Sequence, residues 1–117
     1  MLEVFTRDAV WDGGERFGVH EGIDAIYAFF DGVSGQISWA LHYMIAPVVE
    51  VDGDTARASW YLLEPCTLEG QAVWLMGNYR DEYRREDGRW RISRLEVRFQ
   101  TMTPHDAGWA RTRFVGE

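Results

Sequence analysis

The sequence predicts a single α+β domain, in which one amphipathic helix precedes a curved antiparallel sheet. Hydrophobic side chains recur at helical spacing over residues 22–31, and from Ile37 onward the period changes to two, which is typical of strands. Several predicted strands are also longer than the usual length of roughly five or six residues. Because a twisted sheet of such long strands must curl, we expect a cone with helices over its concave face and a cavity inside.

The helix is predicted from one apolar face and from its two ends. Its apolar side chains, at i, i+3, i+4 and i+7, are Ile23, Ile26, Tyr27 and Phe30. Asp24 lies in the first turn, where a negative charge favours the positive end of the helix dipole. Gly32 follows the last periodic residue and is a common helix stop. Upstream, Leu2 and Phe5 lie at helical spacing, which predicts that residues 1–8 are the last turn of a helix whose body is absent.

The strands are predicted from alternation and from the turn residues between them. Asp52-Gly53-Asp54 and Asp87-Gly88 indicate tight hairpins, and Pro47, Pro65 and Pro104 are expected to end or break strands. The predicted strands cover residues 9–12, 37–46, 48–51, 55–63, 71–83 and 90–101. We expect the tail, residues 105–117, to pack onto the domain because Trp109 and Phe114 are aromatic.

Composition excludes several classes of function. The chain has 117 residues, with 19 acidic and 12 basic side chains, and every basic residue is Arg. A Lys Schiff base and a phosphate loop that ends in Gly-Lys are therefore excluded. The net charge of −7 disfavours nucleic acid as the main partner, since phosphate binding needs a basic face.

Location and metal binding are also constrained by the sequence. Cys66 is the one cysteine and is compatible with a reducing cytoplasm, and no apolar run predicts a membrane span or a signal peptide. His20, His42 and His105 have no short ligand spacing to one another or to Cys66, so no metal site is predicted. No glycine fingerprint for a dinucleotide is present either. We therefore expect a cytoplasmic protein with cofactor-free chemistry, or with none.

Three segments carry a resemblance to a known family. They are FTRDAVWDGGERFGVHEGIDAIYAFF, LHYMIAPVVEVDGDTARASWYL and GNYRDEYRREDGRWRISRLEV. In this order and spacing they resemble SnoaL-like domains of the nuclear transport factor 2-like superfamily, over nearly the whole of residues 1–117. The resemblance implies a cone-shaped α+β barrel with a deep apolar pocket, commonly a homodimer through the sheet. Its members include dehydratases, a dehydrochlorinase, isomerases, polyketide cyclases and proteins without catalysis, so the fold alone does not give the function.

One departure from the family lies at the N-terminus. Members usually begin with a further long helix that helps to close the cone and often carries a Tyr and an Asp that face the pocket. Here Met1 falls where that helix would end, so we expect it to be truncated. Either the true start lies upstream, or the cone is open or is capped by something else. The family's Asp, which pairs with a strand His in the dehydratases, corresponds to no residue of this sequence.

His42 is the main catalytic candidate. It matches the strand His that acts as general base in dehydratase and dehydrochlorinase relatives, and imidazole titrates near neutral pH. On the last strand, Glu96 and Arg98 share the phase of Trp90 and Ile92. If that face is concave, Arg98 is placed to stabilise an oxyanion or leaving group, and Glu96 to orient His42 or act as an acid.

Each candidate also has a structural interpretation. His42 can be a hydrogen-bonded residue of the core or of a dimer face, and Glu96 and Arg98 can belong to a solvent-facing charge ladder, the interpretation we favour for Arg94. Asp12, near the pocket mouth in the family's layout, is a possible replacement for the missing carboxylate. For the apolar ligand-binding candidates a core role is the more frequent outcome. The predicted ligand-binding residues are Trp11, Phe30, Met44, Trp60, Trp74, Met76 and Asn78, with Tyr79 as a second polar group.

Two functions remain open from the sequence. The first is a cofactor-independent dimer that binds a small apolar molecule, such as a steroid, terpenoid or polyketide, and catalyses dehydration, elimination or isomerisation by acid–base chemistry. His42 would be its base, with Arg98 or Glu96 as the partner. The second is a non-catalytic binding or interaction module. The absent helix favours this alternative, because an open cone excludes water poorly.

Overall fold

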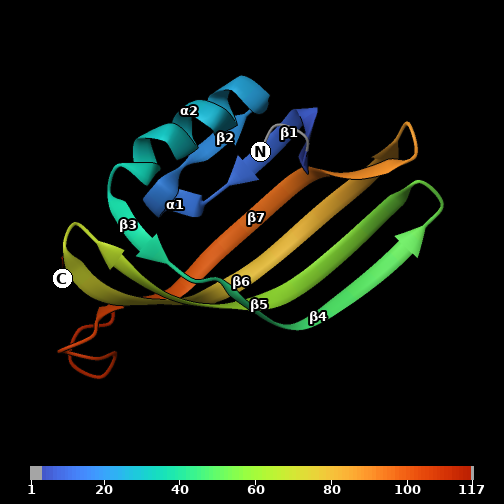
Figure 1. Ribbon diagram of the computed structural model, residues 1–117. Helices are drawn as coiled ribbons and strands as arrows, with labels where there is room; N and C mark the ends of the chain where they lie inside the picture. The colour runs from blue at the N-terminus through green and yellow to red at the C-terminus, as the bar shows by residue number, and fades with distance from the viewer. Residues whose placement is uncertain (1–3, 117) are drawn as a thin grey trace.

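The computed structural model describes residues 4–116, which form two helices and seven strands. Figure 1 shows a strongly curved sheet with both helices above its concave face. In chain order the elements are β1 (Phe5–Asp12), α1 (Gly14–Phe17), β2 (Val19–Glu21), α2 (Ile23–Ser34), β3 (Ile37–Ala40), β4 (Tyr43–Asp52), β5 (Thr55–Leu68), β6 (Gln71–Glu86) and β7 (Arg89–Pro104). The α+β cone predicted from the sequence is confirmed.

The strands form one sheet in the order β2-β1-β7-β6-β5-β3, and β4 pairs with β5 next to β3. All pairings are antiparallel except that β1 runs parallel to β7, so the sheet is mixed rather than wholly antiparallel. The hairpin ends of β4–β5 and β6–β7 extend beyond α2 (Figure 1). The helices therefore cover only one end of the concave face.

Several of the predicted element boundaries are wrong, including the end of α2, which continues past Gly32 to Ser34. Phe5 begins strand β1, so residues 5–8 are not a helical turn, and Leu2 lies outside the described residues. The predicted strand 37–46 is divided into β3 and β4, and β4 continues through Pro47 to Asp52. The register of β4 shifts between Ile45 and Val48, and Ala46 has a φ of 53°. A proline is tolerated at such a bulge, on a strand at the edge of the sheet that pairs with β5.

Pro65 does not break its strand, because of where its backbone points. The carbonyl of Pro65 accepts a hydrogen bond from the Leu41 amide at 3.1 Å, so this side of β5 faces the connection between β3 and β4. A residue's amide and carbonyl point to the same side of a strand, so the ladder loses little where β3 and β4 separate. The predicted hairpin turns are confirmed, with φ of 60° at Gly53 and 76° at Gly88.

The core has two parts, both on the concave side of the sheet. The part beneath α2 consists of Phe5, Ala9, Trp11, Ile26, Leu95 and Val97. The second part consists of Cys66, Val73, Leu75 and Met102, and Phe114 from the tail packs against it. The tail also exchanges backbone hydrogen bonds with Met102, although Trp109 is exposed. Between residues 4 and 116, neither helix is long and apolar enough to cross a membrane.

Candidate functional site

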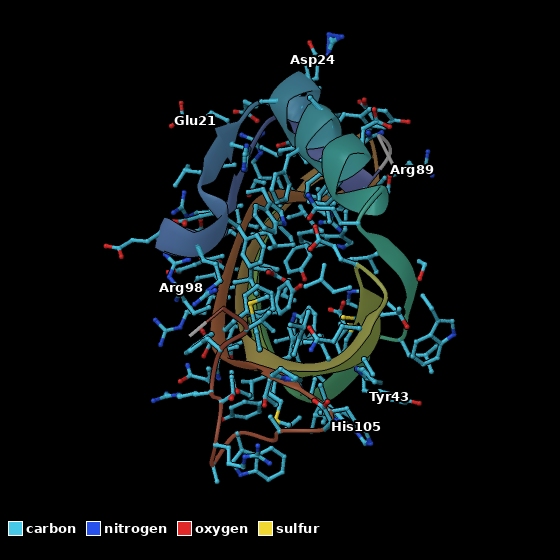
Figure 2. All side chains as sticks on the ribbon, turned by 90° about the vertical axis from the view of Figure 1, so that its left-hand side faces the viewer. Glu21, Asp24, Tyr43, Arg89, Arg98 and His105 are labelled. Atoms are coloured by element: carbon cyan, nitrogen blue, oxygen red, sulfur yellow. The ribbon has the colours of Figure 1, made fainter. Side chains whose placement is uncertain are left out.

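A cavity of about 200 Å³ lies between α2 and the concave face of the sheet. Its wall is almost entirely apolar and mostly aromatic. In the view of Figure 2, side chains fill the space between α2 and the curved sheet. The residues that line the cavity are Trp11, Phe17, Phe29, Phe30, Val33, Ile37, Ala40, His42, Glu64, Leu75, Tyr79 and Phe99. Among the described residues, those of this wall that carry polar side-chain atoms are His42, Glu64, Tyr79 and, through its indole nitrogen, Trp11.

His42 and Glu64 form an ion pair at the edge of this cavity. Nε2 of His42 lies 2.9 Å from Oε1 of Glu64. The Glu64 side chain on β5 is 6% exposed, whereas the His42 ring is 55% exposed. His42 was predicted in the middle of a strand, but it lies in the two-residue connection between β3 and β4. This connection places the imidazole between the buried carboxylate and the solvent.

The carboxylate determines which nitrogen of His42 can act as a base. A hydrogen bond to Glu64 raises the pKa of His42 above its usual value of 6.5, and partial burial opposes this shift. Because an ionised carboxylate only accepts hydrogen bonds, Nε2 carries the hydrogen and donates it. In the neutral ring, Nδ1 therefore keeps its lone pair. This is the geometry in which a carboxylate orients a histidine base and stabilises its protonated form.

Glu64 is the candidate functional residue that the sequence analysis missed. Its signal was nevertheless present, because Glu64 occupies the buried phase of β5. Leu62 and Cys66, two residues before and after it, are both buried. A carboxylate among such neighbours needs a partner, because a buried unpaired charge is costly.

Glu96 and Arg98 lie on the opposite face of the sheet from the cavity, contrary to their expected position. On β7, Leu95 and Val97 belong to the core beneath α2, and Glu96 and Arg98 alternate with them. Figure 2 shows Arg98 outside the curved sheet. The register between β6 and β7 shifts at Ser93, so Trp90 and Ile92 do not share a phase with residues 94–98. This bulge explains why the predicted partnership of His42 with Glu96 or Arg98 is wrong.

Asp12, another candidate carboxylate, also forms its ion pairs on the outer face of the sheet. Arg94 Nη2 lies 3.0 Å from Asp12 Oδ2, and Arg98 Nη1 lies 3.1 Å from Asp12 Oδ1. Arg98 Nη2 in turn lies 3.1 Å from Glu96 Oε1. The hydrogen bond from Arg98 lowers the pKa of Asp12, and a backbone hydrogen bond from Gly14 acts in the same direction. These four charged side chains form one ion-pair network that tethers β1 to β7.

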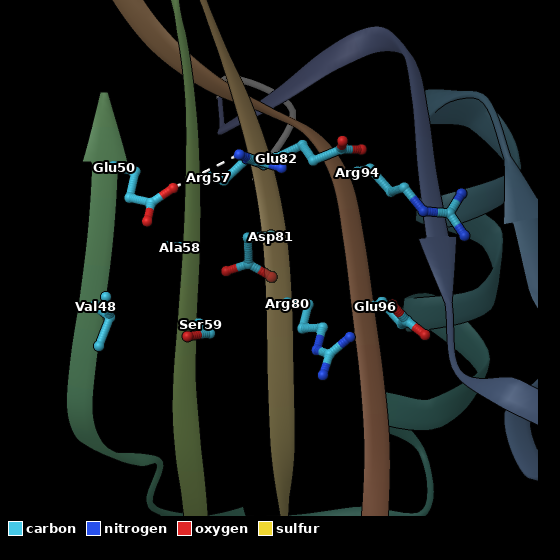
Figure 3. Close-up of a pocket in the computed structure, with 10 residues that line it drawn as sticks. All are labelled: Val48, Glu50, Arg57, Ala58, Ser59, Arg80, Asp81, Glu82, Arg94 and Glu96. Carbon is cyan, nitrogen blue, oxygen red and sulfur yellow. Dashed lines mark ion pairs between the residues drawn. The ribbon is translucent and has the colours of Figure 1, made fainter. Parts of the chain in front are cut away.

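The outer face also carries a shallow groove of about 360 Å³ across β4 to β7. Figure 3 shows acidic and basic side chains alternating along it, with Arg57 paired to Glu50. Its charged lining residues are Glu50, Arg57, Arg80, Glu82, Arg94 and Glu96, together with Asp81. Over the described part of the chain, no group of three or more His, Cys, Asp or Glu residues is arranged to hold a metal ion.

The predicted ligand-binding residues separate into three groups. Trp11 and Phe30 line the cavity. Trp60 lies further along the sheet, where its ring stacks on that of Tyr79, and Met44 is exposed on β4. The other three, Trp74, Met76 and Asn78, do not line the cavity; they alternate along β6 with Leu75 and Tyr79, which do. Both phases of β6 contain apolar residues, so alternation alone did not identify the inner one.

Comparisons with known proteins agree with this fold. The family model for the SnoaL-like domain matches residues 1–96, and the chain belongs to this family. A solved structure of a putative aromatic ring hydroxylase from Novosphingobium aromaticivorans is 32% identical with a TM-score of 0.81, covering 88% of this chain and 75% of that chain. No curated protein matches the sequence.

Two further solved structures extend the comparison. Hexachlorocyclohexane dehydrochlorinase LinA-type3 from Novosphingobium barchaimii is 25% identical with a TM-score of 0.76, covering 88% of this chain and 73% of that chain. An NTF2-like protein with a cystatin-like fold, from Novosphingobium aromaticivorans, is 22% identical with a TM-score of 0.69, covering 94% of this chain and 70% of that chain. The second of these shows the fold alone.

Proposed function

We propose that this protein binds a small apolar molecule in the cavity beneath α2 and removes a proton from it with His42. The observation that carries the proposal is the 2.9 Å contact between His42 Nε2 and Glu64 Oε1 at the edge of an apolar cavity. A histidine oriented by a carboxylate is a general base suited to neutral pH. The likeness to a dehydrochlorinase supports an elimination, since that reaction also begins with the loss of a proton.

The proposed elimination is a single concerted step. Nδ1 of neutral His42 takes a proton from a carbon of the ligand, and the electron pair of that C–H bond becomes a new C=C bond. The leaving group departs from the adjacent carbon with its own electron pair. Glu64 stabilises the resulting imidazolium through the hydrogen bond at Nε2. In an isomerisation, the proton returns instead to another carbon of the ligand.

The cavity favours a ligand of one or two rings. Its volume of about 200 Å³ lies below the roughly 300–1,000 Å³ of most ligand pockets. Aromatic side chains such as Trp11, Phe29 and Phe30 offer flat surfaces for a compact apolar body. Small terpenoids and cyclised polyketides fit this description.

The experiment is a screen of small cyclic substrates. It includes hexachlorocyclohexane, a cyclic β-hydroxyketone and a β,γ-unsaturated cyclic ketone, which report elimination of chloride, dehydration and isomerisation respectively. Chloride release and the absorbance of conjugated products are measured for the wild type, His42→Ala and Arg98→Ala. We expect turnover to require His42 and not Arg98. Equal turnover by His42→Ala on a substrate that the wild type converts would reject the mechanism.

A second candidate is a ligand-binding module without catalysis. The half-exposed ring of His42 favours it, because a site open to water shields a developing charge poorly. In this case the wild type binds members of the same panel, none of them is converted, and His42→Ala changes affinity little. Equilibrium binding measured beside turnover separates the two functions.

We also propose that the protein is a homodimer located in the cytoplasm. Strand β4 supports the dimer, because every residue in it is exposed and apolar side chains lie on both of its faces, with Glu50 and Asp52 confined to its hairpin end. Its exposed large apolar residues are Tyr43, Met44, Ile45, Val48, Val49 and Val51. A single species of 13.6 kDa in sedimentation at micromolar concentration would refute the dimer. The buried free thiol of Cys66 is compatible with the cytoplasm, which cell fractionation tests.

A further inference from the structure

We propose that Tyr79 donates a hydrogen bond to an oxygen atom of the ligand, so that the site selects apolar ring compounds that carry a carbonyl or hydroxyl group. This inference rests on the proposed function, because it requires that the cavity beneath α2 binds a small apolar molecule. It goes further by naming a second recognition group and a chemical class of ligand.

Tyr79 supplies a hydroxyl group of the cavity that is left for a ligand oxygen. Its side chain lines the cavity together with His42 and Glu64. The latter two are engaged with each other through Nε2 and Oε1. Within residues 4–116, no hydrogen bond satisfies the hydroxyl of Tyr79. A ligand oxygen is a natural partner for such a donor, since no protein acceptor within residues 4–116 competes for it.

The phenol ring of Tyr79 is held in place from behind. It stacks on Trp60, which lies opposite it on β5, with ring centroids 4.0 Å apart and planes inclined by 4°. The indole Nε1 of Trp60 donates a hydrogen bond to Asp81 Oδ2 at 2.9 Å. The hydroxyl of Tyr83 donates to the same oxygen at 2.9 Å. Asp81 therefore fixes Trp60, and Trp60 fixes the plane in which Tyr79 presents its hydroxyl.

The surroundings of Tyr79 also keep its hydroxyl protonated. Burial raises the pKa of Tyr79 well above its usual value of 10, and the negative charges of Glu64 and Asp81 raise it further. The group therefore remains a donor at any pH at which His42 acts as a base. A donor that is fixed before the ligand arrives loses little freedom on binding, which improves both affinity and selectivity.

The test uses two probes of similar shape, indane and 1-indanone, which differ by one carbonyl group. Dissociation constants are measured by ligand-observed NMR for the wild type and for Tyr79→Phe, which keeps the ring and removes the hydroxyl. We expect the wild type to prefer the ketone by roughly two- to tenfold, the range for one hydrogen bond. Tyr79→Phe is expected to lose this preference and to bind indane unchanged.

A spectroscopic signature accompanies the affinities. The carbonyl stretch of bound 1-indanone is expected at a lower wavenumber in the wild type than in Tyr79→Phe, because a hydrogen bond weakens the C=O bond. Tyr61→Phe is the matched control, since it removes a hydroxyl from an exposed tyrosine of the adjacent strand that does not line the cavity. Trp60→Phe keeps an aromatic ring and removes the tether to Asp81. It is expected to reduce the ketone preference only in part, and it tests the inference even if Tyr79→Phe does not fold.

The outcomes separate this inference from the proposed function. If both probes bind and Tyr79→Phe changes neither the ketone preference nor the carbonyl stretch, the inference is overturned and the apolar site stands. The same holds if the wild type shows no preference for the ketone. If neither probe binds, the proposed function fails and the inference fails with it.

Discussion

The two faces of the sheet use the same kinds of charged residue for different purposes. On the concave face, Glu64 is buried and contacts one partner, His42, beside an apolar cavity. On the outer face, Glu96 shares its partner Arg98 with Asp12 in a network that solvent reaches. Glu64 tunes one titratable ring, whereas Asp12, which is also buried, and Glu96 share arginine partners that hold β1 and β7 together. The comparison teaches that the number and kind of partners, rather than residue type or burial alone, separate a candidate catalytic carboxylate from a structural one.

The largest expected effect comes from removing the imidazole of His42 at the cavity, compared with removing the guanidinium of Arg98 on the outer face. His42→Ala is expected to lower turnover of a converted substrate by roughly 100- to 10,000-fold, the usual contribution of a positioned base. Arg98→Ala is expected to lower it less than about threefold, because the residue contacts Asp12 and Glu96 and not the cavity. Steady-state kinetics at saturating substrate decide the matter. A comparable loss in both variants would make the outer face part of the site.

Packing should differ between the faces nearly as much. Ile26 of α2 is 1% exposed and lies in the core beside the cavity, whereas Val48 on β4 is 61% exposed. Ile26→Ala is expected to lower the free energy of unfolding by about 2–5 kcal/mol at any protein concentration. Val48→Ala is expected to cost about 0.5 kcal/mol or less when the protein is dilute enough to be monomeric, and more at concentrations at which the proposed dimer covers β4. Urea unfolding of both variants at low and high protein concentration measures this. A cost at Val48 that equals that of Ile26→Ala in the dilute protein would contradict the comparison.

The pH dependence of the rate gives a sharper comparison between Glu64 and Glu96. Glu64→Gln removes the charge that raises the pKa of His42, so the acidic limb of the pH–rate profile is expected to move to lower pH. The plateau is expected to fall by about tenfold or more, because the imidazolium loses its counter-charge. Glu96→Gln should leave both limb and plateau unchanged. An unmoved limb in Glu64→Gln would show that His42 is not the group whose titration limits the rate.

The same pair has a consequence for stability. The folded pKa of His42 lies above its unfolded value of 6.5, so its favourable contribution is complete below pH 6.5. That contribution is lost as the pH rises through the raised folded value. The stability difference between the wild type and Glu64→Gln should therefore narrow from pH 6 to pH 9, when it is measured by urea unfolding at each pH. A difference that is constant over this range would mean that the contact is independent of the charge on His42.

The sequence was sufficient for the fold class, because this depends on local pattern, and it named His42 as a candidate that the structure places at the cavity. The period of 3.6 around Ile26, the change to a period of two after Ile37 and the turn residues Gly53 and Gly88 each specify their element without distant contacts. The position of His42 came from the family's segment order. These signals survive even though the strand around His42 is interrupted.

The partner of His42 could not be predicted from local sequence pattern, because it depends on contacts between residues that are distant in the sequence. Glu64 reaches His42 only because β5 folds back beside the β3–β4 connection. The bulge at Ser93 exchanges the inward-facing and outward-facing residues of β7. The residues that precede Ser93 give no sequence signal that predicts this change. Alternation therefore placed Glu96 and Arg98 on the wrong face. Burial of a charged residue in an apolar phase, as at Glu64, was the more informative signal.

The smallest expected effect concerns the network on the outer face. The folded pKa of Asp12 lies below its usual value of 3.8, so its contribution to stability is present above pH 3.8 and is lost as the pH falls through the lowered value. Asp12→Asn keeps an acceptor for the Gly14 amide and removes the charge opposite Arg94 and Arg98. It is expected to cost at most about 1 kcal/mol at pH 7 and low salt, and less at high salt, because these arginines are partly exposed. Turnover should not change. Urea unfolding at two salt concentrations and two pH values checks this, and a cost that resists both salt and acid would show that Asp12 acts by shape rather than by charge.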